Sequence, residues 1–350
     1  MTRACACLFA LVLVASPVHA QTPPPAAAAP ATPQFAVVDI GALSYLQYDA
    51  ELKNRDAYNV FDVTRAYLNI NARLTPRVRF RFTPDIRRVT DSSLAGSLVL
   101  RVKYAFGQLD NPTTERSWIR FGLHQTPWLD FEESINRYRV QGTMFSEREG
   151  LIPGSADFGV SSFMPFGGGL GEVQGGVFNG EGFTQAEPNK YKSAQGRLTI
   201  RPFFNGGILR GLRGSVFYNA GWYAADRPRR LGIVMGSFEH PHVVATAQYL
   251  KAKENPLPTL PADIDRNGWS VFFEPRQGPA GWAGILRYDS LDPDEAITVN
   301  NQNRLILGTA YWIVRGRVRI GLVATDEQVD YQAPARPDEN RLLLQTHFEF

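Results

Sequence analysis

The sequence predicts an all-β protein, a transmembrane antiparallel up-and-down β-barrel of about 16 strands. Three observations lead to this prediction. Apolar residues alternate with polar ones at a period of two from residue 35 onward. The polar face is heavily arginine, and the apolar face is rich in leucine and aromatic residues. Short turns also alternate with long loops along the chain, as they do in barrels that cross a membrane.

Composition excludes two other classes of protein. The 350 residues are 44% hydrophobic, which is too apolar for a chain that is mostly disordered. The sequence has one unbroken apolar helical stretch, at its N-terminus, so it is not a multi-helix membrane protein. Charge is nearly balanced, with 37 Lys+Arg against 34 Asp+Glu, and arginine supplies all but six of the basic residues.

The N-terminus has the features of a secretory signal peptide, predicted over residues 1–20. A short positive segment ending at Arg3 precedes an apolar run, and small residues surround a cleavage site after Ala20. Both cysteines, Cys5 and Cys7, lie in this segment, so a disulfide, a thiolate nucleophile and a cysteine-bound metal are excluded from the mature chain. Residues 21–34 are rich in proline and alanine and predict an extended lead-in to the folded domain, residues 35–350.

The clearest strand pattern begins in the stretch 61–86. Its apolar positions Ala66, Leu68, Ile70, Ala72 and Leu74 alternate with Arg65, Tyr67, Asn69, Asn71 and Arg73. After the turn at Thr75-Pro-Arg77, apolar Val78, Phe80 and Phe82 alternate with Arg79, Arg81 and Thr83. The stretch 98–106 repeats the pattern, with Leu98, Leu100, Val102, Tyr104 and Phe106 on one face and Arg101 and Lys103 on the other. This alternation predicts strands with one face in lipid and one in a polar lumen.

Extended over the whole chain, the pattern predicts sixteen strands, an even number as a closed bacterial barrel requires. Their ranges are 35–48, 58–74, 77–86, 97–107, 116–125, 156–166, 171–179, 191–203, 209–222, 230–239, 242–252, 267–275, 280–290, 303–314, 316–327 and 341–350.

The connections support this assignment. With the N-terminus on the periplasmic side, the inner connections are tight turns such as Thr75-Pro-Arg77 and Arg315-Gly316. The outer connections 126–155, 253–266, 291–302 and 328–340 are long. The last strand ends on Phe348 and Phe350, on one face of the strand, a pattern that resembles the signal read by the outer-membrane barrel assembly machinery.

Strand parity predicts which charged residues face the lumen. The candidate pore-lining, anion-binding residues are Arg65, Arg73, Arg79, Arg81, Arg101, Lys103, Arg120, Arg197, Arg213, Arg287, Arg304 and Arg319; Arg201, Arg317 and Arg341 face the same way. The inward acids are Asp39, Asp85, Asp157, Glu172, Glu274, Asp289 and Glu349. Reversing the parity would place the arginines in lipid, at roughly 2–4 kcal/mol each near the midplane. The lumen is therefore predicted to be basic and to favour anions.

The long connection 126–155 is predicted to fold into the barrel and set the constriction, because it carries several aromatic residues that can pack. Its candidate constriction residues are Arg137, Arg139 and Arg148. An extracellular cover with no filtering role is the alternative for this segment.

Four stretches of the chain resemble the phosphate-selective porin O and P type family of Gram-negative outer membranes. They are FDVTRAYLNINARLTPRVRFRFTPDI (61–86), WIRFGLHQTPW (118–128), SEREGLIPGSADFGV (146–160) and ILRYDSLDPDE (285–295). The resemblance implies a sixteen-stranded homotrimer with an inward-folded third loop and an arginine ladder, for which Arg65, Arg79, Arg81, Arg101 and Arg120 are the matching positions. Phosphate-specific members have a lysine cluster at the constriction, whereas residues 126–155 contain no lysine.

Together these observations predict an outer-membrane porin for passive diffusion of small solutes, with a preference for anions such as phosphate. A loop-plugged structural or adhesive barrel, and a pore for uncharged or carboxylate solutes, are the alternatives. No motif for catalysis, a cofactor, a metal or nucleic acid stands out, and His240 and His242 lack a third ligand. Expected partners are small anions, the assembly machinery, and outer-membrane lipid including lipopolysaccharide, for which Arg227, Arg229 and Arg230 are candidates.

Overall fold

The computed structural model describes residues 37–54, 57–89, 93–257, 259–260, 262–333 and 336–350. The predicted signal peptide and lead-in, residues 1–34, lie outside the described residues. No helix in the described part of the chain is both long enough and apolar enough to cross a membrane.

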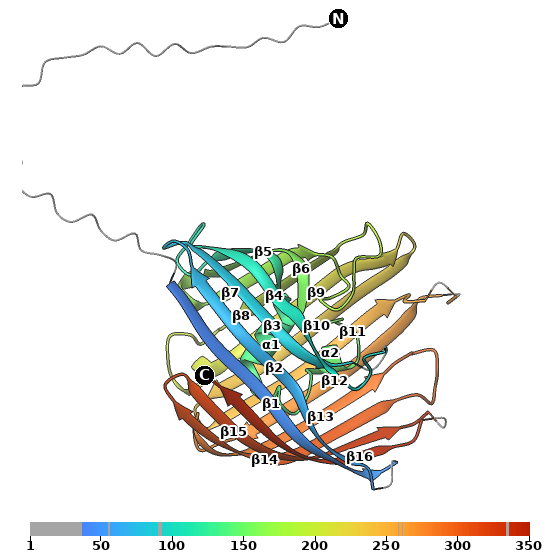
Figure 1. Cartoon of the computed structure of the whole chain (residues 1–350). Coiled ribbons are helices and arrows are strands. Elements are labelled where there is room, and N and C mark those ends of the chain that lie inside the picture. Colours follow the sequence, from blue (N-terminus) through green and yellow to red (C-terminus); the bar gives the residue numbers. More distant parts are fainter. Residues whose placement is uncertain (1–36, 55–56, 90–92, 258, 261, 334–335) are drawn as a thin grey trace, which may run out of the picture. The chain divides into compact units, whose positions relative to one another are not determined.

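The described residues form a closed antiparallel barrel of sixteen strands, which confirms the predicted fold class (Figure 1). The strands are β1 Val37–Lys53, β2 Asn59–Arg73, β3 Val78–Arg88, β4 Leu98–Asp110, β5 Trp118–Gln125, β6 Ala156–Phe166, β7 Gly171–Phe178, β8 Ser193–Ile200, β9 Leu212–Ala224, β10 Arg227–His240, β11 Val243–Glu254, β12 Ile264–Pro275, β13 Gly281–Asp292, β14 Gln302–Arg315, β15 Val318–Tyr331 and β16 Glu339–Glu349. Two α-helices, α1 Pro127–Ile135 and α2 Phe145–Arg148, and two short 3-10 turns, η1 Gly167–Gly169 and η2 Ile208–Gly211, complete the described elements.

The barrel closes where β1 pairs with β16, so that the described sheet has no free edge. The backbones of Ala42 and Phe350 exchange two hydrogen bonds of 3.0 Å at this seam. Closure lets neighbouring strands satisfy one another's backbone groups, which a barrel needs where its outer surface faces lipid.

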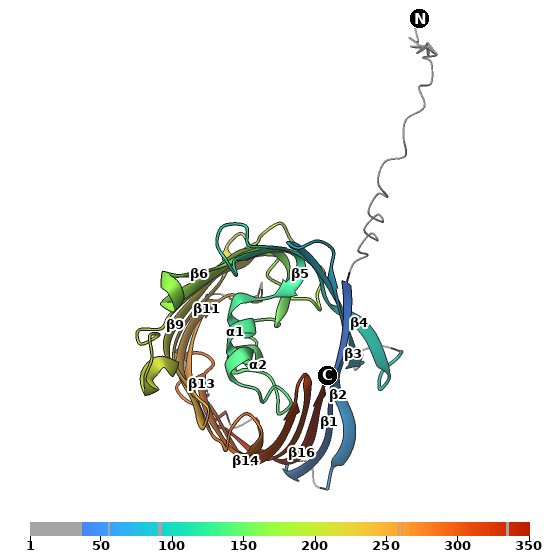
Figure 2. The same ribbon diagram turned by 90° about the vertical axis from the view of Figure 1, so that its left-hand side faces the viewer.

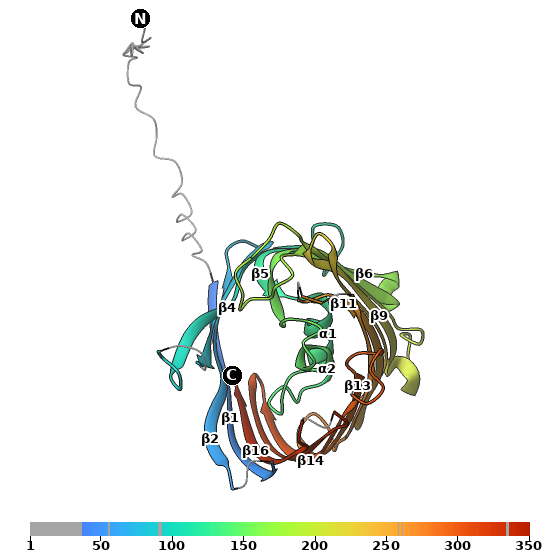
Figure 3. The same cartoon turned by 90° about the vertical axis from the view of Figure 1, so that its right-hand side faces the viewer.

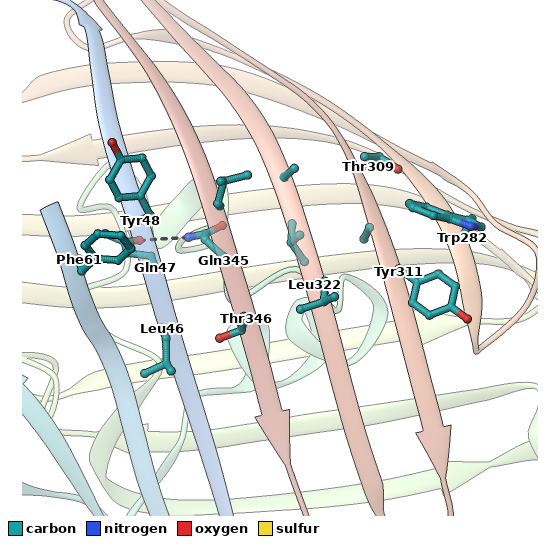
Figure 4. Close-up of a pocket in the computed structure, with 14 residues that line it drawn as sticks. Leu46, Gln47, Tyr48, Phe61, Trp282, Thr309, Tyr311, Leu322, Gln345 and Thr346 are labelled. Carbon is teal, nitrogen blue, oxygen red and sulfur yellow. Dashed lines mark hydrogen bonds between the residues drawn. The ribbon is translucent and has the colours of Figure 1, made fainter. Parts of the chain in front are cut away.

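The outer surface of the barrel is apolar, as the alternation predicts. Leu100 and Phe121 are 70% and 72% exposed, although both are large hydrophobic side chains. A hollow of about 740 Å³ on this surface crosses β13 to β16, β1 and β2. Tyr48 and Phe61 lie at one end of this outer groove, and Trp282 lies at the other (Figure 4). Such a continuous apolar surface is rare on monomeric soluble proteins and fits a hydrocarbon environment.

One glycine in the β4–β5 pair is required by its geometry. Gly122 has a φ of +118°, and a Cβ atom there would lie 2.5 Å from the carbonyl oxygen of Ala105. We expect Gly122→Ala to lower the free energy of unfolding in detergent by about 1–3 kcal/mol, because the neighbouring backbone must move. Gly107→Ala, on the adjacent strand with nothing within 4 Å of the added Cβ, is the matched control. Equal effects of the two substitutions in urea titrations would contradict the prediction.

Candidate pore and its constriction

The segment 126–155 lies inside the barrel, which confirms its predicted inward folding. Figures 2 and 3 show α1 and α2 within the ring of strands, on the side formed by β9, β11 and β13. Trp128 and Phe145 are completely buried and belong to one apolar cluster with wall residues such as Phe217 and Leu231. The apolar residues of the segment are thus matched by an apolar patch on one half of the inner wall.

Two buried carboxylates of the wall hold this segment in place. Glu274 accepts hydrogen bonds from Arg137 at 2.7 Å and from the Tyr138 hydroxyl at 2.8 Å. Glu327 accepts a hydrogen bond of 3.0 Å from Gln141 and lies 3.6 Å from Arg148. Because the middle of the segment is tied to the wall at two points, it forms a fixed partition across part of the lumen.

The opposite side of the lumen remains open. A cavity of about 320 Å³ lies between the β1–β4 wall and α1, with Arg65, Tyr67 and Arg81 on the wall side and Asp130 and Glu133 on the helix side. Further cavities of about 470 Å³ and 400 Å³ also include Arg81 in their lining. These neighbouring cavities follow one basic face of the inner wall toward the short turns.

The arginines of this face differ in their partners. Arg101 pairs with Asp85 at 2.8 Å. Arg79 pairs with Asp110 at 2.5 Å, and Arg120 lies 3.5 Å from Asp130. By contrast, within the described part of the chain no carboxylate pairs with Arg65, Arg73 or Arg81. These three, which we call the acid-free arginines, keep their charge available to a passing solute.

Aromatic rings hold two of the acid-free arginines. The Arg65 guanidinium lies 5.6 Å from the ring centroid of Tyr45 and 5.1 Å from that of Tyr67. Arg81 lies 4.5 Å from the ring centroid of Tyr104, and it donates to the Asn69 side chain at 2.8 Å. The alternation of polar and apolar residues does not by itself indicate a role for these tyrosines. The available signal was that Tyr67 follows Arg65 by two positions and therefore shares its face.

Other residues of the predicted pore-lining set also lie inside the barrel, but they form ion pairs with acids of the barrel. Arg197 pairs with Glu172 at 2.8 Å, Arg287 pairs with Asp289 at 2.7 Å, and Arg304 pairs with Glu327. These three are buried on the side that carries the inner segment. Arg213 pairs with Glu239 at 2.9 Å, whereas Arg319 is exposed and lies 3.9 Å from Glu349. Whether any of them binds an anion stays a prediction.

Lys103 faces the interior of the barrel, as the alternation indicates, but β4 contains a bulge at this residue. Thr83 pairs with Tyr104 and Pro84 with Val102, so Lys103 is left without an opposite residue. Its side chain is 1% exposed and donates to the Ser155 hydroxyl at 2.5 Å. The bulge also turns Tyr104 inward, against the prediction for the face of this strand. A simple period of two fails here because the extra residue shifts its phase.

The inward acids are more numerous than parity predicted. Asp49 and Glu254 lie beyond the predicted ends of their strands, whereas Glu239 and Glu327 are the last residues of predicted strands and were not counted as inward. Each of the four has an arginine within 3.6 Å. The twofold excess of basic over acidic groups is therefore an overestimate for the lumen as a whole. The local excess along β2 and β3 is what distinguishes the open side.

The three candidate constriction residues of the inner segment are all paired with acids. Arg137 contacts Glu274 and Arg148 contacts Glu327, as described above. Arg139 lies 3.1 Å from Glu133 and 2.6 Å from Glu147. Arg137 and Arg139 still line the 320 Å³ cavity, whereas Arg148 does not. Their main observed role is to fix the segment.

Arg227, Arg229 and Arg230 do not form one site. Arg229 points inward and donates to the carbonyl of Gly180 at 2.7 Å, and Arg227 donates to the carbonyl of Pro256 at 3.1 Å. Arg230 alone of the three is exposed.

Glu132 on α1 is a buried carboxyl of the inner segment. It accepts hydrogen bonds from Trp128 at 2.9 Å and from Gln248 at 2.6 Å. Burial raises the pKa of Glu132 to about 7, although Arg287 opposes this shift and Asp289 adds to it. The folded protein thus holds this proton more tightly than the unfolded chain, and the resulting stability is lost as pH rises through about 7.

We expect Glu132→Gln to remove this loss. The free energy of unfolding of the native protein should fall by about 2–3 kcal/mol more than that of the variant between pH 5 and pH 8. Urea titrations across that range measure the difference, and Glu115→Gln in an exposed turn is the control. Parallel pH profiles of native protein and Glu132→Gln would show that this carboxyl does not titrate in the range.

Comparison with solved structures places this geometry among known barrels. The anion-selective porin from Comamonas acidovorans has a TM-score of 0.64 at 12% identity, over 90% of this chain and 100% of that one. The barrel has the porin fold. A loop L8 deletion mutant of OmpT, an outer membrane protein of Vibrio cholerae, has a TM-score of 0.64 at 13% identity. The match covers 90% of this chain and 99% of that one. A high-pH structure of Pseudomonas putida OprB has a TM-score of 0.63 at 9% identity, and the match covers 89% of this chain and 94% of that one.

No protein-family model matches the sequence, and a search of curated proteins finds no match. The similarity is therefore one of fold, because identities of 9–13% do not indicate a shared solute or activity. Within the porin fold, the inner segment follows the fifth strand and narrows the lumen from one side.

Proposed function

We propose that this protein is a passive outer-membrane pore that prefers small anions. The observation that carries the proposal is the set of acid-free arginines, Arg65, Arg73 and Arg81, along open cavities inside a closed barrel. A lumen in a low-dielectric wall focuses the field of such charges and raises the local concentration of anions. The apolar outer surface supports insertion in a lipid bilayer.

The position of the inner segment favours a pore over a plug. The segment packs on the β9–β14 half of the wall, and cavities remain on the β1–β5 half. The neighbour from Comamonas acidovorans is described as an anion-selective porin, which supports the same preference here. Phosphate remains one candidate solute among small anions.

The other predicted features belong to the same proposal. Export by the signal peptide and insertion by the barrel assembly machinery would place the chain in the outer membrane of a Gram-negative bacterium. The homotrimer implied by the family resemblance would bury part of the apolar outer surface, and the outer groove in Figure 4 is one place for such a contact. Lipopolysaccharide would meet the exposed Arg230 on the lipid side of β10.

Conductance in a planar bilayer tests the proposal. The refolded protein is placed under a KCl gradient, and the reversal potential gives the ratio of anion to cation permeability. We expect discrete steps of current with a reversal potential on the chloride side of zero. A cation-selective reversal potential would reject the anion preference, and an absence of steps from correctly folded protein would favour the plugged barrel.

A further inference from the structure

We propose that Arg65 and Arg81 form a site for small carboxylates with an apolar body, at the narrow part of the lumen. This inference rests on the proposed pore function and names its solute class. Both arginines line the 320 Å³ cavity beside α1, and three tyrosines surround them: Tyr45, Tyr67 and Tyr104. A volume of this size suits a small organic solute.

The acids that face this cavity form their close ion pairs with cations other than the two arginines, and Glu133 attracts Arg65 only at longer range. Asp130 lies 3.5 Å from Arg120, and Glu133 lies 3.1 Å from Arg139. The third acid of the lining, Glu349, is 3.9 Å from Arg319 and 3.3 Å from His347. Each carboxylate of the lining therefore has a cation other than Arg65 and Arg81. The two guanidinium groups are left for an external anion.

The aromatic rings determine how these guanidinium groups are presented. Arg65 is flanked by two tyrosine rings and Arg81 by one. A guanidinium held against a ring keeps its plane fixed. Arg81 donates through Nε to Thr83 at 3.1 Å and through Nη2 to Asn69 at 2.8 Å, so its terminal N–H edge is the one left for a solute. That edge matches the two oxygen atoms of a carboxylate, which it binds through two parallel hydrogen bonds. A spherical ion such as chloride gains the charge attraction but no such match.

The rest of the lining favours an apolar body over a strongly hydrated anion. The rings of Tyr45, Tyr67 and Tyr104 offer apolar and π surface next to the charges. The lining includes no lysine, whose compact ammonium binds phosphate as a point charge. The hydroxyl of Tyr67 is buried and has no hydrogen-bond partner among the described residues. An unused donor of this kind is expected to gain a partner when a solute or water occupies the cavity.

The test compares benzoate with inorganic phosphate as blockers of the KCl current. In the native protein, we expect benzoate to halve the current at a concentration at least tenfold below that needed with phosphate. In the double variant Arg65→Lys/Arg81→Lys, both charges remain but the planar edges are lost. We expect benzoate block to weaken at least tenfold while the KCl reversal potential stays the same.

Two controls separate this proposal from the pore function. Arg230→Lys makes the same substitution at an exposed arginine on the lipid side of β10, and it should leave benzoate block unchanged. The single variants Arg65→Lys and Arg81→Lys should each weaken benzoate block in part. They allow the test to be made even if the double variant folds poorly. Equal block by benzoate and phosphate, or native block in the double variant, would overturn the carboxylate site. A cation-selective native protein would instead overturn the proposed function, because that property is read from the reversal potential alone.

Discussion

Replacing Arg65, Arg73 and Arg81 together by glutamine is expected to turn an anion-preferring pore into one that prefers cations. The three side chains carry the positive charge along the open side of the lumen that no carboxylate of the described residues pairs with. We expect the ratio of anion to cation permeability to fall by roughly tenfold, at the low end of the enrichment that focused charge produces. The reversal potential under a KCl gradient measures this ratio directly.

A variant that removes three positive charges elsewhere is the control. Arg230, Lys251 and Lys253 are exposed on the lipid side of β10 and β11, and their replacement by glutamine makes the same change in net charge. Their charges are separated from the lumen by the wall, so selectivity should hardly change. Equal shifts in the two triple variants would show that net charge, and not the position of the charges, sets the preference. An unchanged ratio in the lumen variant would remove the basis of the proposed function.

Glu327→Ala is expected to cause the largest loss of stability. This carboxylate is completely buried, and Arg148, Arg304 and Arg341 surround it. Removing it leaves three guanidinium groups close together without their common acid. We expect the free energy of unfolding in detergent to fall by about 3–5 kcal/mol, the usual cost of leaving buried charge unpaired.

The same substitution should also affect the current. Glu327 ties Arg148 and Gln141 of the inner segment to the wall, so that segment should move more freely without it. We expect noisier open-channel current from Glu327→Ala than from native protein. Asp338→Ala removes an exposed acid that pairs with Lys53 at 2.7 Å and should change the stability by at most about 1 kcal/mol. Similar stability losses for the two variants would mean that Glu327 does not anchor the segment.

The strand order and most strand positions could be predicted because alternation is a local property of the chain. The range 156–166 was predicted without error, and β1 differs chiefly by five further residues at its end. Aromatic content likewise indicated that residues 126–155 would pack inside. The pattern failed from Tyr104 onward, because a bulge at Lys103 changes the phase of β4. A single added residue leaves no signal in the composition of the strand.

The sequence by itself determined that this chain forms a closed barrel with an apolar exterior, a basic stretch of inner wall and a long segment able to fold inward. These features depend on the period of two along each strand and on the length of each loop, and both can be read from residues that are neighbours in the sequence. The tertiary structure alone decided which arginines remain free. Arg137 meets Glu274 across 137 positions of sequence, and Gln141 meets Glu327 across 186. The strand register and the position of the inner segment determine which acids pair with which arginines. Arg65, Arg73 and Arg81 are the acid-free arginines that result.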